Sequence, residues 1–100
     1  MVKHIVMWNF AETAEGATRA ENLRKAKAGL DSLQGLLPGL RKLEIALGAD
    51  GLEHSYDMVL YSEFDTAADL KAYATHPDHV AQATFIKACA TARVAFDYEI

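Results

Sequence analysis

The spacing of apolar residues changes repeatedly along this sequence, and the order of the changes constrains the fold more than any other feature. Residues 2–10 alternate at the strand period, which puts Val6 and Trp8 on the same face as His4. From residue 14 to residue 37 the period becomes helical, and the leucine-rich stripe ends at Leu37-Pro38-Gly39. Proline removes a backbone donor and glycine permits a turn, so the predicted helix stops there.

The second half of the chain repeats this change of period. Residues 40–48 and 56–64 alternate and predict two strands joined by a glycine-containing turn. Thr66-Ala-Ala-Asp69 resembles a capping box and predicts a short helix, and Pro77 suits the first turn of the next helix. Residues 93–100 predict a last strand. The order β-α-β-β-α-α-β is typical of a ferredoxin-like α+β domain with a four-stranded antiparallel sheet.

Length and charge exclude several classes of function. Residues 1–100 have room for a single domain. A net charge of -4 provides no basic field, so nucleic acid is not an expected partner. No run approaches the ~18 apolar residues of a membrane span, and the first ten residues lack a signal-like segment, so we expect a cytoplasmic protein with no membrane partner. Cys89, the only cysteine, is expected to be a small buried hydrophobe.

Two of the predicted strands carry large apolar residues on both faces, whereas helices can cover only one face of the sheet. The apolar residues left on the uncovered face are Ile5, Met7, Val59 and Tyr61. Contiguous apolar patches of this kind usually mark interfaces, and a second copy of the chain is the simplest cover. We therefore expect a homodimer. The alternatives are a monomer with a partly apolar sheet surface and a sheet covered by its own termini.

Histidines are the residues most suggestive of chemistry. His79 lies one turn inside the helix predicted to begin at Pro77 and can point toward the sheet, whereas His54 is expected in solvent. His76 either caps that helix or shares a face with His79. A three-histidine metal site that adds His4 is the weaker interpretation, because H-x-x-H is a common spacing and the zinc-helix motif is absent. We therefore expect no metal.

Tyr73 and Asp97 could complete an acid–base site. A tyrosine hydroxyl can polarise a carbonyl oxygen, and a carboxylate can orient an imidazole and stabilise its protonated form. Each residue also has a structural alternative, Tyr73 as part of the core and Asp97 as a solvated strand residue. Spacing alone does not decide between these interpretations.

Three segments together resemble the stress-responsive dimeric α/β-barrel family. They are Val2-Lys-His-Ile-Val, Tyr73-Ala-Thr-His-Pro-Asp-His79 and Phe96-Asp-Tyr98. The resemblance covers essentially the whole chain in the same order of elements, and it implies a dimeric α/β barrel. The chain is similar in particular to a plant polyketide cyclase of this family. That similarity implies an intramolecular aldol reaction without a metal or an organic cofactor.

The resemblance also implies roles for individual residues. His79 would be the general base or acid, Tyr73 would polarise a carbonyl, and Asp97 would face the helices and orient His79. We expect the substrate pocket to be lined by His4, Val6, Trp8 and Leu60. With Asp97 turned inward, Phe96 and Tyr98 would face the barrel.

This chain departs from the plant cyclase at several pocket positions. The cyclase has a histidine on its third strand where this chain has Met58, and Gln82 and Ala90 are among the replacements of its pocket aromatics. A polyketide is therefore not implied as the substrate.

Three functions remain open from the sequence. The first is a cofactor-independent enzyme acting on a small polyketide-like or otherwise enolisable carbonyl compound. The second, of equal standing, is a non-enzymatic stress-associated dimer that binds a small apolar ligand. The third is a cofactor-free oxygenase.

Overall fold

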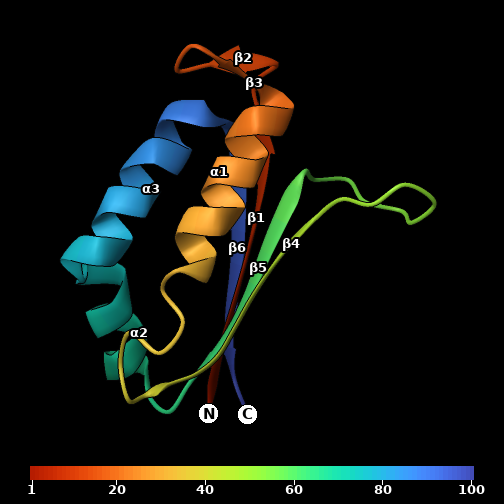
Figure 1. Ribbon diagram of the computed structural model, residues 1–100. Coiled ribbons are helices and arrows are strands. Elements are labelled where there is room, and N and C mark those ends of the chain that lie inside the picture. The colour runs from red at the N-terminus through yellow and green to blue at the C-terminus, as the bar shows by residue number, and fades with distance from the viewer.

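The computed structural model describes residues 1–100 and places three helices on one face of a four-stranded antiparallel sheet (Figure 1). The strand order is β4-β5-β1-β6. The strands of this sheet are β1 (Val2–Phe10), β4 (Leu40–Leu47), β5 (Met58–Phe64) and β6 (Ala90–Glu99). The helices are α1 (Arg19–Asp31), α2 (Ala67–Thr75) and α3 (Pro77–Cys89). The predicted ferredoxin-like α+β fold is confirmed.

The first helix is shorter than predicted at both ends. A small hairpin, β2 (Thr13–Ala14) and β3 (Ala17–Thr18), replaces its expected first turn, because Glu15 and Gly16 adopt left-handed φ values of 52° and 73°. The helix stops at Asp31, and Gly35, with φ of 71°, lies in the turns that follow. Leu33 in those turns is still buried, so the apolar stripe continues beyond the helix and misled the prediction.

The predicted helix starts at Thr66 and Pro77 are confirmed. The Thr66 hydroxyl accepts a hydrogen bond from the Asp69 backbone N–H, and Pro77 is the first residue of α3. His76 caps α3, since its Nδ1 accepts a hydrogen bond from the Asp78 backbone N–H at 3.1 Å. His76 itself is extended, with φ of -64° and ψ of 135°, and separates α2 from α3.

The core lies between the helices and the sheet. Residues of β1 at the predicted even positions face the helices, and Val6 and Phe10 are almost fully buried there. They meet Ala26 and Leu30 of α1 in one apolar cluster. Cys89 is a buried free cysteine, as expected.

The opposite face of the sheet carries no helix (Figure 1). The strand register puts Ile5 of β1 between Tyr61 of β5 and Phe96 of β6, and the next row contains Met7, Val59 and Val94. We call this set the helix-free patch: Ile5, Met7, Val59, Tyr61, Val94 and Phe96. Its β6 edge is the most open part, with Phe96 68% exposed.

The last strand begins at Ala90 rather than at residue 93. Cys89 ends α3 and Ala90 is already extended, with φ of -78° and ψ of 140°. No turn residue marks this junction in the sequence, because the chain passes from helix to strand without a connecting loop.

Candidate active site

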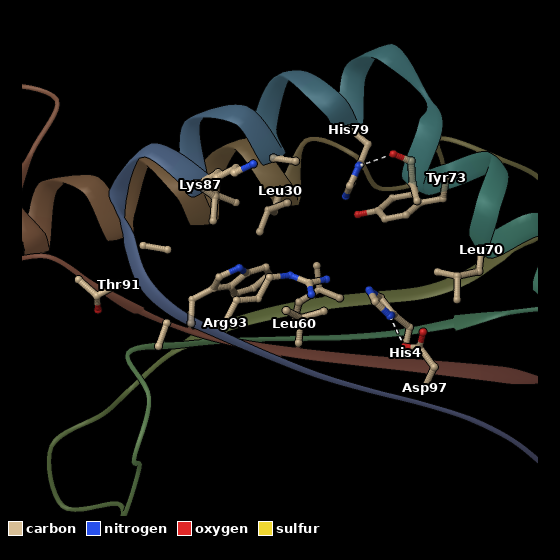
Figure 2. Close-up of a pocket in the computed structure, with 17 residues that line it drawn as sticks. His4, Leu30, Leu60, Leu70, Tyr73, His79, Lys87, Thr91, Arg93 and Asp97 are labelled. Atoms are coloured by element: carbon tan, nitrogen blue, oxygen red, sulfur yellow. Dashed lines mark hydrogen bonds and ion pairs between the residues drawn. The ribbon is translucent and has the colours of Figure 1, made fainter.

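A cavity of about 650 Å³ lies between the sheet and the helices, and all seven residues predicted for the site line it. They are His4, Val6, Trp8, Leu60, Tyr73, His79 and Asp97. Eleven of the 17 lining residues are hydrophobic, and both the volume and the apolar lining are typical of small-molecule sites. Figure 2 shows Tyr73 and His79 entering the cavity from the helices and His4 from the sheet.

His79 is held in one tautomer. Its Nδ1 lies 3.0 Å from the carbonyl oxygen of Ala74, which can only accept, so Nδ1 carries the proton. The other ring nitrogen, Nε2, is then a free acceptor directed into the cavity (Figure 2). Burial lowers the pKa of His79, the Ala74 carbonyl opposes this, and the nearby His4 and Arg93 lower the pKa further. The geometry and the lowered pKa both favour a neutral imidazole that can accept a proton.

Tyr73 presents a buried donor without a partner. Its side chain is 1% exposed, and its hydroxyl forms no hydrogen bond. Burial raises the pKa of Tyr73 to about 12, which keeps the phenol protonated at neutral pH. The ring packs against Phe64 at 5.3 Å and His79 at 4.5 Å between ring centroids. Buried polar groups are normally paired, so this hydroxyl is suited to meet an acceptor on a ligand.

Asp97 pairs with His4 rather than with His79. The two residues lie directly opposite each other on β6 and β1, and the Asp97 carboxylate accepts a hydrogen bond from His4 Nδ1. The prediction that Asp97 orients His79 is wrong, because the Ala74 carbonyl already occupies Nδ1 of His79. What Asp97 does instead is fix the orientation of the His4 ring through this hydrogen bond.

The remaining histidines lie outside the cavity. His76 is used as the cap of α3, and His54 is exposed, with Nδ1 2.9 Å from the Leu52 carbonyl oxygen. His76 therefore does not join His4 and His79 in a three-histidine cluster.

The sequence analysis missed two cationic residues of the site, Arg93 and Lys87. Arg93 precedes Asp97 by four residues on the same strand, so the two share a face of β6. The prediction that Asp97 faces the helices should therefore have placed Arg93 on the same side of the sheet. Lys87 carried no comparable signal, because its helix position fits an exposed residue equally well.

The sequence matches the family described as Stress responsive A/B Barrel Domain over residues 2–100. The chain belongs to this family. The resemblance of the three sequence segments to this family is thereby confirmed. The dimeric α/β barrels of the family are therefore the proteins with which this stress-responsive barrel domain is compared. None of its helices combines the length and the apolar character needed to cross a membrane.

Solved structures share the fold over nearly the whole chain. A dimeric protein of unknown function from Bacteroides fragilis is 32% identical, with a TM-score of 0.81 and coverage of 99% of this chain and 95% of that one. A hydroxynitrile lyase from Passiflora edulis is 21% identical, with a TM-score of 0.74 and coverage of 99% and 92%. A Nitrosomonas europaea protein provisionally named an antibiotic biosynthesis monooxygenase is 18% identical, with a TM-score of 0.80 and coverage of 100% and 98%. The last two show a common fold only. No curated protein matches the sequence.

Proposed function

We propose that this stress-responsive barrel domain is a cofactor-independent enzyme that transfers a proton at an enolisable carbonyl compound bound in the cavity. The observation that carries the proposal is the pairing of a buried, unpartnered donor with a free acceptor. The donor is the Tyr73 hydroxyl, and the acceptor is Nε2 of the adjacent His79.

The proposed reaction begins with the two groups acting on one substrate. Tyr73 donates a hydrogen bond to the carbonyl oxygen, and His79 Nε2 removes a proton from the neighbouring carbon. The electron pair of the broken C–H bond forms a C=C bond, and the carbonyl electrons move to the oxygen as an enolate. Because Tyr73 is buried and needs no reorientation, its hydrogen bond would strengthen as this negative charge develops.

The enolate can then attack a second carbonyl of the same molecule, which is the aldol step of a cyclase. The new C–C bond uses the enolate electron pair, and the attacked carbonyl oxygen takes up a proton. The proton that His79 removed can return to that oxygen, which balances the step, and His4, oriented by Asp97, can hydrogen-bond the oxygen from the sheet side of the cavity. The apolar walls, which include Trp8 and Leu60, suit an aromatic or polyketide-like carbon skeleton.

We also infer that the protein is a homodimer in which the helix-free patch is the interface. The patch forms two cross-strand rows across β5, β1 and β6 with no helix over them. The Bacteroides fragilis relative is described as dimeric. A specific interface of this kind should bury more than roughly 1,000 Å² in total.

Deuterium exchange tests the proposed chemistry even when the product is unidentified. Enolisable ketones such as 4-phenylbutan-2-one and 4-oxo-6-phenylhexanoate would be incubated with the protein in D2O, and loss of the α-proton signals followed by NMR. The wild-type protein should accelerate exchange of at least one compound, and His79→Ala should lower that acceleration by about 100- to 10,000-fold. His54→Ala, which removes an exposed histidine far from the cavity, should exchange at the wild-type rate. Compounds that bind without any accelerated exchange would favour the non-enzymatic ligand-binding function instead.

A further inference from the structure

The most informative group outside the proposed proton-transfer pair is Arg93. It lies on β6 directly opposite Trp8 and lines the same cavity. Figure 2 shows it on the sheet side, from which His4 also enters, below His79 and Tyr73. Arg93 is near enough to His79 to contribute to the lowering of the histidine pKa. A positive charge therefore stands beside the proposed reaction centre.

No acidic group of the protein neutralises this charge. Asp97 is the only carboxylate among the lining residues, and it is bonded to His4. The Arg93 side chain forms no ion pair or hydrogen bond, and the same is true of Lys87, the other cation of the cavity. The cavity thus has an excess of positive charge in a protein whose net charge is -4.

The donor geometry selects among anions. A guanidinium offers two parallel N–H donors that match the two oxygens of one carboxylate. A phosphate would favour additional backbone donors, as at a glycine-rich loop or an open helix start. The start of α3 offers little of this, because Pro77 has no N–H and the Asp78 N–H is bonded to His76.

We propose that Arg93 makes the cavity selective for a carboxylic acid, so the substrate is a carbonyl compound whose apolar skeleton also carries a carboxylate. The carboxylate pairs with Arg93 on the sheet side, and the skeleton lies along the apolar wall toward Tyr73 and His79. The identity of the reacting carbonyl rests on the proposed function. The recognition of the carboxylate does not, and it can be measured with ligands that undergo no reaction.

The test uses two unreactive probes of the same shape, 3-phenylpropanoate and its neutral amide, 3-phenylpropanamide. Trp8 is the only tryptophan and lines the cavity, so its fluorescence reports binding, and calorimetry provides an independent measurement. Wild type should bind the acid about 10- to 100-fold more tightly than the amide, the range expected for a charged hydrogen-bonded pair. Arg93→Met should reduce the preference to less than about threefold, and Arg93→Lys should restore part of it.

The controls separate Arg93 from a general effect of charge. Arg24→Met makes the same chemical change at an exposed position outside the cavity and should keep the full preference. A wild-type protein that prefers the acid but exchanges no α-protons would contradict the proposed function and leave this inference standing. Thermal melts of every variant verify folding.

Any one of five results would overturn the inference. Four concern the probes and variants: equal binding of acid and amide by wild type, no detectable binding of the acid at millimolar concentration, a preference that survives in Arg93→Met, and loss of the preference in Lys87→Met alone. Inorganic phosphate that competes as strongly as the acid would likewise contradict selection of a carboxylate.

Discussion

Replacing Tyr73 by phenylalanine should make the protein more stable and less active. The substitution removes only the hydroxyl, which is buried and has no hydrogen-bond partner. The ring and its contacts with Phe64 and His79 remain. A buried polar group that has lost its water and gained no partner destabilises a fold, so its removal relieves that penalty.

The magnitude follows from the desolvation of one hydroxyl. Leaving such a group unpaired costs about 1–3 kcal/mol, and we take the lower end because Tyr73 adjoins a cavity. For a domain of this size, about 1 kcal/mol corresponds to a rise in Tm of about 4–8 °C. The same substitution removes the proposed hydrogen bond to the substrate carbonyl, so the exchange rate should fall.

Thermal melts followed by circular dichroism measure the stability at a fixed protomer concentration, because dimerisation would make Tm depend on concentration. Tyr56→Phe is the matched control: Tyr56 is partly exposed, and its hydroxyl is not among the buried unpaired atoms. Its Tm should stay close to that of wild type. A Tm for Tyr73→Phe clearly below wild type would show that the hydroxyl has a stabilising partner, and the reasoning would be refuted.

Three further predictions concern other parts of the molecule. Burial lowers the pKa of His79 from 6.5, so the unfolded chain binds the extra proton first as pH falls. The unfolding free energy from urea titrations should therefore decrease from about pH 7 toward pH 5. His79→Gln should make the unfolding free energy less dependent on pH over this range. An equal pH dependence in wild type and His79→Gln would contradict this prediction. A double-mutant cycle with His4→Gln and Asp97→Asn should give effects on the unfolding free energy that are not additive, since the two side chains are hydrogen-bonded to each other. Additive effects would refute the pairing. Phe96→Glu should convert a dimer at micromolar concentration into a monomer in sedimentation velocity, and a monomeric wild type would defeat the proposed interface.

Periodicity predicted the main elements because each buries one face or one stripe. The strand at residues 2–10 and the helix start at Pro77 agree with the structure, since alternation and a proline at the first helical turn are local properties. The hairpin before α1 was not predictable in the same way. It depends on a non-glycine residue, Glu15, with positive φ, which the sequence pattern does not signal.

The residues that share the cavity were named in advance, but their pairing was not. The family resemblance implied that His4 and Asp97 belong to one pocket with His79, and all three line the cavity. Which histidine Asp97 contacts depends on the register of β6 against β1, and a single sequence does not specify that register. Arg93 was missed for a related reason. A charged residue on a strand usually faces solvent, and only the direction of Asp97 shows that Arg93 lies on the side of β6 that faces the cavity.

The proposed proton transfer is tested most sharply by the order of α-proton exchange rates among four proteins assayed on the same ketone. We expect wild type and Asp97→Asn to be fastest and close to each other, Tyr73→Phe to be slower, and His79→Ala to lose about 100- to 10,000-fold. The order follows from the roles: Asp97 holds His4, which acts only in the later aldol step, Tyr73 polarises the carbonyl, and His79 takes the proton itself. Exchange by folded His79→Ala at the wild-type rate would contradict the proposed chemistry.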